Sequence, residues 1–244
     1  MNSTIPHSRR RLSRQKGQET LMFGLLVLFV YTPLLLGMFV IGMNLIVNIQ
    51  VNNMTRDLAN LYIHGTDFSA YGAQQLAQQL ATGLGLQFPT FSSTAGVPNT
   101  NQATNTATSG NGIVWVTQVM YVGATTDPQC ATVGAANCTN HDSFVFLQQI
   151  VFGNSALKMQ KDTALGYPTG ATLSTSGVVS NPLTDSHAAL SAPNDAVLDA
   201  LWQTTSNGQS SLVDGQVVYV VESFFQTPTF SLGTAQTLPG TYAR

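Results

Sequence analysis

The stretch that decides the fold spans residues 17–43 and reads GQETLMFGLLVLFVYTPLLLGMFVIGM. No charged residue occurs between Glu19 and Arg56. As an α-helix, residues 21–43 would span about 35 Å, which is enough to cross the hydrocarbon core of a bilayer. The sequence therefore predicts a transmembrane anchor, with Pro33 as a local disturbance of its helical hydrogen bonding.

A basic leader precedes this apolar run. It holds five of the nine Lys and Arg residues, whereas the rest of the chain has four basic residues against eleven acidic ones. The positive-inside rule predicts a single-pass protein with a cytoplasmic amino terminus and most of the chain outside. Because these cations adjoin a membrane span, nucleic-acid binding is not expected. The five leader residues are Arg9, Arg10, Arg11, Arg14 and Lys16.

The apolar run differs from a cleaved secretory signal. It is about twice as long as the usual apolar region, and no A-x-A-like cleavage site follows it. We therefore expect an uncleaved signal-anchor. The alternative is cleavage before the run, between Gly17 and Gln18.

The rest of the chain has few charges. Only 8% of all residues are charged, against about 25% in ordinary soluble domains. Such a composition is more typical of an exported surface or assembly protein than of a cytosolic enzyme.

Helical periodicity continues beyond the apolar run. Apolar residues recur at spacings of three and four and predict a stripe along a juxtamembrane helix, within a helical segment of residues 18–64. The stripe packs either against the chain's own outer domain or against another assembly protein. Its members are Val47, Val51, Met54, Leu58 and Leu61.

The remaining segments predict an α+β fold. Gly65 is expected to end the juxtamembrane helix. A short helix is expected within residues 65–89, with Leu76 and Leu80 on its apolar face and Gln74 on the opposite side. A polar linker is expected over 90–111, and an outer α+β domain over 112–244. Strands are expected over residues 112–123, 143–152 and 217–225, with an edge strand over 158–164 and a short helix over 192–203. Because the three main strands are apolar on both faces, we expect a small, mainly antiparallel sheet with one or two packed helices on one face, and loops or a partner on the other.

The only two cysteines, Cys130 and Cys138, lie in a predicted loop between two strands. Outside the cytoplasm, such a pair most economically forms a disulfide. A metal site that also uses His141 is the alternative, but no fourth ligand is evident.

Catalytic motifs are not recognisable. His141-Asp142 and Asp185-Ser186-His187 contain residue types that hydrolases use, but adjacency in sequence does not make a triad. No G-x-S-x-G, H-E-x-x-H or P-loop motif occurs. We expect neither enzymatic activity nor a cofactor or metal site, and an anchored hydrolase is the least favoured function.

Two stretches resemble a known family. Arg14-Gln15-Lys16-Gly17-Gln18 and the following apolar run with Pro33 resemble the amino terminus of TadE-like minor pseudopilins of tight-adherence pilus systems. Residues 216–228, QVVYVVESFFQTP, resemble the Val-rich strand that ends such domains. Together these matches cover about 60 residues. The resemblance implies a bacterial inner-membrane protein whose partners are the bilayer, other pilus or secretion assembly proteins and pseudopilins, with a prepilin peptidase acting after Gly17.

One position departs from the family pattern. The family usually has a Glu immediately before the Phe of the apolar run, but Met22 precedes Phe23 here, and Glu19 is the only nearby carboxylate. This departure favours a TadG-like anchored partner over a processed filament subunit. A generic signal-anchored binding or adhesion module is the alternative function.

Overall fold

The computed structural model describes residues 9–87, 104–194, 196, 198, 213–226 and 240–243. The chain divides between residues 46 and 47 into two compact units. The helix α2 (Thr32–Ile63) continues across this division.

The first unit contains the apolar helical segments. The helix α1 (Arg9–Leu26) is followed directly by a π-helical turn, Val27–Tyr31, and then by α2. In this turn the Thr32 N–H donates to the carbonyl oxygen of Val27, and the Thr32 hydroxyl donates to the same oxygen over 3.1 Å. Pro33 has no N–H and its ring crowds the preceding turn, so the wider turn lies where the sequence predicts a disturbance.

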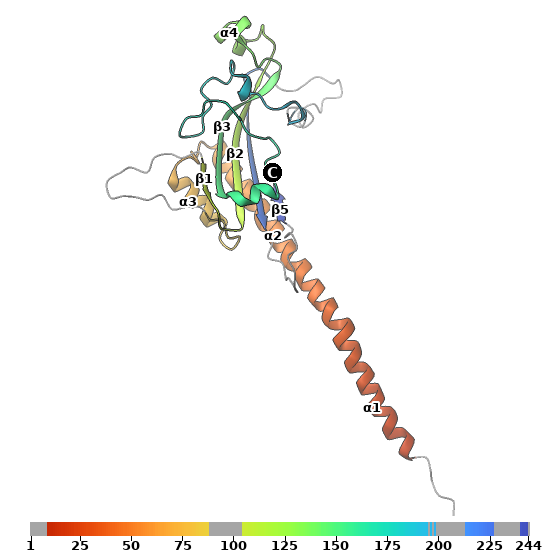
Figure 1. The fold of residues 1–244 in the computed structure, drawn as a ribbon. Coiled ribbons are helices and arrows are strands. Elements are labelled where there is room, and N and C mark those ends of the chain that lie inside the picture. The colour runs from red at the N-terminus through yellow and green to blue at the C-terminus, as the bar shows by residue number, and fades with distance from the viewer. Residues whose placement is uncertain are drawn as a thin grey trace, which may run out of the picture. The chain divides into compact units, whose positions relative to one another are not determined.

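The second unit is built on a five-stranded mixed sheet in the order β1-β3-β2-β4-β5 (Figure 1). The β2–β3, β2–β4 and β4–β5 pairs are antiparallel, and the β1–β3 pair is parallel. The predicted α+β architecture is confirmed. The strands are β1 (Thr104–Ala107), β2 (Gly112–Val122), β3 (Ser143–Asn154), β4 (Val217–Gln226) and β5 (Gly240–Ala243).

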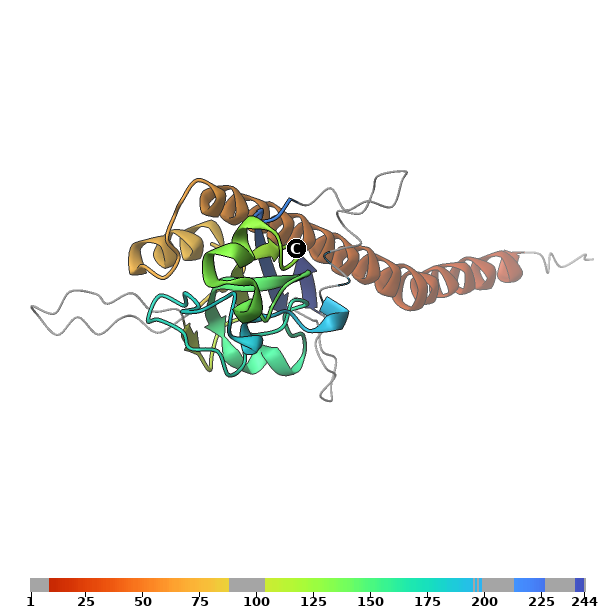
Figure 2. The same ribbon diagram turned by 90° about the horizontal axis from the view of Figure 1, so that it is seen from above.

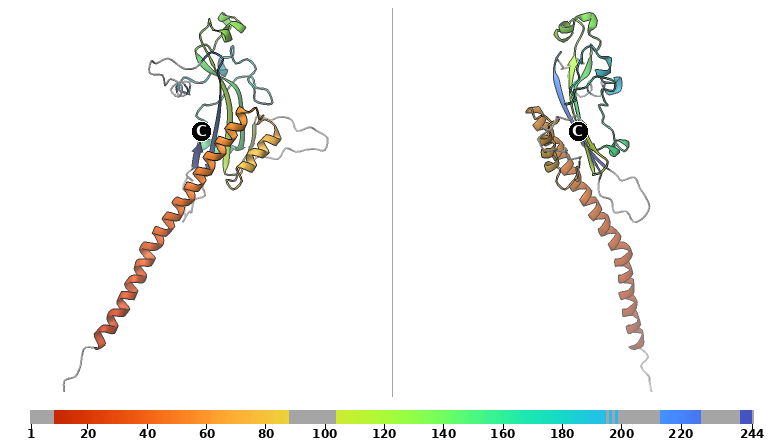
Figure 3. Two further views of the ribbon diagram at one scale, coloured as in Figure 1. Left: turned by 180° about the vertical axis from the view of Figure 1, so that it is seen from behind. Right: turned by 60° about the vertical axis from the view of Figure 1, so that its left-hand side comes forward.

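One face of the sheet packs against helices. The carboxyl-terminal part of α2 and the helix α3 (Tyr71–Leu80) lie on this face, as the right-hand view of Figure 3 shows. Leu58 and Phe68 are fully buried against strand residues that include Val116 and Phe152. At one end of this core, the Tyr62 hydroxyl donates to Gln148 Oε1 over 2.9 Å. Apolar burial from both layers therefore fixes this part of α2 on the sheet.

A glycine ends α2 in the way the sequence predicts. Gly65 has a φ of 87°, its N–H donates to the Tyr62 carbonyl, and the Thr66 N–H donates to the Leu61 carbonyl. This pattern is a Schellman motif, which needs a left-handed residue that glycine supplies at little cost. The chain then turns into α3, which lies beside the end of α2 (Figure 2).

The opposite face of the sheet is covered by mostly irregular segments between residues 155 and 198. They bury Phe144, Phe146 and Val218 together with Leu165 and Leu190. Short 3-10 helices at Ser155–Met159 and Ser186–Ala188 interrupt these segments. Loops therefore cover this second face, where the sequence predicted either loops or a partner.

The structure corrects three details of the prediction. Residues 158–164 do not form an edge strand, because a 3-10 helix and turns occupy the start of this stretch. The end of the predicted linker over 90–111 forms β1, a short edge strand of small polar residues without the hydrophobic alternation that would reveal it. In α3, Leu76 and Leu80 are exposed, whereas Gln74 is buried.

Part of the predicted helix over 192–203 lies outside the described residues. Its described residues, 192–194, 196 and 198, are helical. Leu198 is fully buried among the residues of the loop-covered face.

Replacing Leu58 by Ala tests the helix-covered core. Leu58 is fully buried, so Leu58→Ala should lower the free energy of unfolding by about 2–5 kcal/mol. Leu76→Ala on α3 is the matched control, because Leu76 is 37% exposed, and it should cost less than about 1 kcal/mol. Urea unfolding of the detergent-solubilised full chain measures both, and equal losses would contradict the assigned packing.

Candidate functional site

The first candidate functional site is the apolar helix. The structure has one helix, Gly17–Ile63, that is long and apolar enough to cross a membrane, counted among the described residues only. Apart from the partly buried Val40, its apolar side chains between residues 21 and 41 are exposed on all sides: Phe29 is 69% exposed, Leu35 is 64% exposed and Ile41 is 70% exposed. Exposed apolar surface of this extent is unfavourable in water and marks a site that contacts lipid or protein.

The predicted processing position lies inside this helix. Gly17 and Gln18 are part of α1, and both are exposed. A Cβ atom added at Gly17 would meet nothing within 4 Å. Substitutions at Gly17 are therefore compatible with the helix.

The predicted interaction stripe is packed within the second unit. Val51, Met54 and Leu58 are buried in the core between α2 and the sheet, and Val47 and Leu61 are partly buried against it. Of the two interpretations of the stripe, the structure supports packing against the chain's own domain. Because these side chains already pack within the unit, they do not form a surface for another assembly protein, which was the other interpretation of the stripe.

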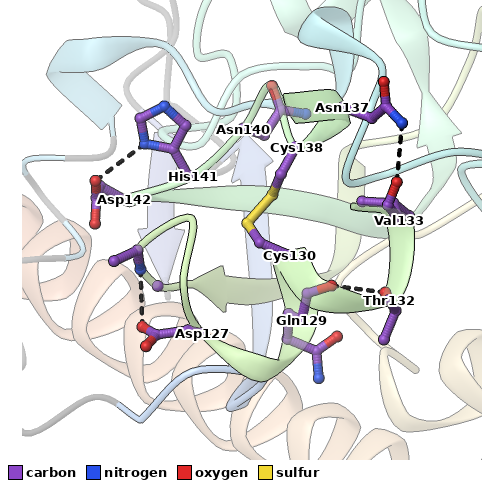
Figure 4. The surroundings of a disulfide bond; sticks show 12 residues. Asp127, Gln129, Cys130, Thr132, Val133, Asn137, Cys138, Asn140, His141 and Asp142 are labelled. Carbon is purple, nitrogen blue, oxygen red and sulfur yellow. Dashed lines mark hydrogen bonds and ion pairs between the residues drawn. A yellow bond between two sulfur atoms is a disulfide. The ribbon is translucent and has the colours of Figure 1, made fainter. Parts of the chain in front are cut away.

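The two cysteines close a cap over the far end of the helix-covered face. Cys130 and Cys138 form a disulfide, with Cα atoms 5.2 Å apart, between α4 (Pro128–Val133) and the end of a 3-10 turn, Ala135–Asn137. Figure 4 shows the bond bridging the two sides of this loop. Both cysteines are buried with Met120, Val122 and Val145. The disulfide thus fixes the loop that covers a small apolar cluster.

A carboxylate ties the same cap to the strands. Asp214 Oδ1 accepts a hydrogen bond from the Gly123 N–H over 2.8 Å, and Oδ2 accepts one from the Gln129 N–H over 2.9 Å. Asp127 Oδ2 accepts a third from the Ala124 N–H, also over 2.8 Å. Hydrogen bonds to ionised groups are stronger than neutral ones, so these carboxylates fix where α4 begins.

Two His–Asp pairs lie in neighbouring loops beside the cap. His141 Nδ1 lies 3.0 Å from Asp142 Oδ2, and His187 Nδ1 lies 3.0 Å from Asp185 Oδ1. The Asn140 side chain joins the loops by donating to the carbonyl oxygens of Pro182 and Asp185 over 2.8 and 2.7 Å.

Each His–Asp pair is local and solvent-exposed. The backbone N–H of His187, and then its side chain, lower the pKa of Asp185 below its usual value. Within the described parts of the chain, no three His, Cys, Asp or Glu residues are grouped to hold a metal ion. Each His–Asp contact joins residues only one or two positions apart and so stabilises a turn of its own loop.

Sequence reasoning missed a buried polar cluster on the loop-covered face. Glu222 is fully buried at the centre of β4, where it accepts hydrogen bonds from the Thr163 hydroxyl and from the Ala164 N–H. Beside it, the Tyr167 hydroxyl accepts from Trp115 Nε1 over 2.9 Å and donates to Asp162 Oδ1 over 2.6 Å. Burial raises the pKa of Tyr167 above its usual value, and this cluster fixes the loop that the prediction took for an edge strand.

A charged residue within a Val-rich strand could have indicated this cluster. A carboxylate in such a position must be exposed or hydrogen-bonded. The sequence alone does not say which, because the donors come from residues 59 and 58 positions away.

Comparisons with protein-family models, with curated proteins and with solved structures find no match to this chain. The function is therefore argued from the chain's own geometry.

Removing the disulfide tests its role in the cap. The double variant Cys130→Ala/Cys138→Ala should lower the free energy of unfolding by about 2–3 kcal/mol, because the unfolded chain gains loop entropy. Hydrogen exchange should rise around α4 but not in α3. Dithiothreitol is the control, since it should lower the stability of the native protein and leave that of the variant unchanged. An unfolding midpoint of the variant equal to that of the native protein would contradict a stabilising role of the disulfide.

Proposed function

We propose that this protein is a bitopic membrane component of a pilus or secretion assembly, similar to TadE/TadG-like proteins. Its amino terminus lies in the cytoplasm of a bacterium, the apolar helix crosses the inner membrane, and the α+β unit works outside by binding other assembly proteins. The observation that carries the proposal is the surface of the helix over residues 21–41, whose large apolar side chains are exposed all round.

Lipid is the environment that suits this surface best. A helix that is apolar on every side has no polar face to present to water. The backbone groups of the segment are satisfied within the helix, as a bilayer requires. The π-helical turn before Pro33 keeps the helix continuous across the one residue that cannot donate a hydrogen bond.

The charges around the helix support the proposed orientation. The leader carries five Lys and Arg residues before the span, and Arg56 is the first charge after it. A concentration of positive charge on one side of a span favours retention of that side in the cytoplasm. A structural disulfide is also typical of an oxidising compartment outside the cytoplasm.

An anchored assembly partner fits the residues better than a filament subunit. Met22 is 67% exposed on the helix at the position where the resembling family has a carboxylate. A membrane-embedded carboxylate needs a partner charge, and the resemblance implies that a neighbouring subunit's amino terminus supplies it in the family. Without that group at position 22, the helix has no such reason to enter a filament.

Adding charge to the helix tests the anchor. Leu28 and Leu35 are 60% and 64% exposed, so Leu28→Lys/Leu35→Lys removes little packing but should cost about 2.5–3.5 kcal/mol per lysine at the membrane centre. The native protein should stay in the membrane pellet after alkaline carbonate extraction, and the variant should move largely to the supernatant. Asn53→Lys adds charge at an exposed position outside the apolar run and should stay in the pellet.

One outcome of the carbonate experiment would contradict the proposal. Release of the native protein from the membrane would show that the apolar helix is covered by protein rather than lipid.

The mature amino terminus tests the choice between anchored partner and pseudopilin. Intact-mass measurement of protein from native membranes should give a chain that begins at Met1. A start at Gln18 would instead identify a processed pseudopilin, and Gly17→Leu, which fits the open space around Gly17, should then abolish that product. A start beyond Met43 would contradict the anchor itself.

A further inference from the structure

The two edges of the sheet differ in how much of their length is paired with other segments. The outer edge of β3 is covered along its length: β1 pairs with its last four residues, from Val151 to Asn154. Before them, irregular segments pair with it through bridges at Val145 and Gln148, and the Val179 N–H donates to the Leu147 carbonyl over 2.8 Å. On the opposite side of the sheet, β5 pairs with β4 only between Ser223 and Gln226.

The uncovered part of β4 presents backbone groups outward. The Gln226 N–H donates to the Asn111 carbonyl over 2.7 Å, and the Gln216 carbonyl accepts from the Tyr121 N–H over 3.0 Å. Even-numbered residues therefore face β2, since the register between β2 and β4 has no shift. In an antiparallel strand the alternate residues, Val217, Tyr219 and Val221, then point their N–H and C=O groups away from β2, and no residue in the described part of the chain bonds to these groups.

We propose that this edge of β4, residues 217–221, binds an extended, uncharged strand of another protein. A row of outward N–H and C=O groups in strand geometry is complementary to a further strand, and such pairing supplies affinity through main-chain hydrogen bonds. This inference deepens the proposed function by assigning the surface with which the outer unit binds another assembly protein. It rests on the proposed function for the choice of partner.

The side chains of this edge favour an uncharged partner. The stretch reads VVYVV, with none of the Lys, Pro or bulge features that usually protect an edge from pairing. The adjacent Glu222 is buried and bonded to Thr163, so its carboxylate does not face the edge. Tyr219 is 36% exposed and offers an aromatic surface to a cross-strand neighbour.

A second copy of this chain is a poorer occupant. Thr55 Oγ1 lies 2.6 Å from Ser223 Oγ, and the rings of Tyr62 and Tyr219 lie 5.1 Å apart, so α2 runs opposite to β4 along the sheet. Symmetric pairing of two β4 edges is antiparallel and would reverse α2 in one copy. The two chains would then enter the pair from opposite ends, which does not suit two proteins anchored in one membrane.

Hydrogen exchange of the purified full chain in detergent tests whether the edge is open. The amides of Val217, Tyr219 and Val221 should exchange at least tenfold faster than those of Val218, Val220 and Glu222. Equal protection of all six amides would show that the chain closes its own edge, and would overturn the proposal. This measurement involves no membrane or partner, so its result is independent of the anchoring experiments.

Photo-crosslinking in native membranes tests the occupant. Tyr219 is replaced by p-benzoylphenylalanine, and Leu76 on α3, which is 37% exposed, receives the same group as the matched control. We expect an adduct with a different protein at position 219 only, with the attachment site mapped by mass spectrometry to an uncharged segment. An adduct only with this chain, an equal adduct at position 76, or no adduct would overturn the proposal.

A proline variant ties the adduct to backbone pairing. Val217→Pro removes an outward N–H that bonds to no described residue and leaves the ladder with β2 intact, because proline is tolerated at the first residue of an edge strand. The yield of the adduct at position 219 should fall at least fivefold, while disulfide formation is unchanged. An unchanged yield would show that backbone pairing does not hold the partner.

Discussion

The second unit depends on the contact between the carboxyl-terminal part of α2 and the sheet. Val51 and Leu58 are fully buried there, and Thr55 and Ser223 share a hydrogen bond across the same interface. The contact covers a sheet that is apolar on both faces and would otherwise be exposed on this one. The disulfide-closed cap extends this cover over the part of the face formed by Met120 and Val145, and loops cover the other face.

The sequence predicted the parts of the fold whose hydrophobic pattern is strong. The apolar helix, its continuation along the stripe and the three long strands each combine many apolar residues with a clear period, so that tertiary contacts reinforce the local preference. The glycine at position 65 and the cysteine pair were also predictable, because few local geometries suit those residue types in those positions. These features place the ends of the three long strands to within two residues, whereas α1 begins at Arg9, inside the predicted leader.

The features that the prediction missed depend on contacts distant in sequence. Gln74 is buried because its amide donates to the Phe68 carbonyl, whereas a hydrophobic pattern assigns Leu76 and Leu80 to the core. Glu222 is buried because a loop about 60 residues earlier supplies its donors. β1 has small polar residues, and only its pairing with the last residues of β3 makes it a strand. The local sequence does not indicate hydrogen-bond partners that are so distant along the chain. The buried polar contacts of the second unit therefore could not be predicted from it.

The position of the division between the two units has a practical consequence for experiments on the outer part. It falls within α2, between residues 46 and 47, rather than in a loop. A truncated protein that starts after Gly65, where the helix ends, would lack Val51, Met54 and Leu58 and would expose the strand residues that they cover. A soluble fragment must therefore begin near residue 47 and keep about the last five turns of the helix. Those turns belong to the core of the second unit rather than to the exposed apolar segment.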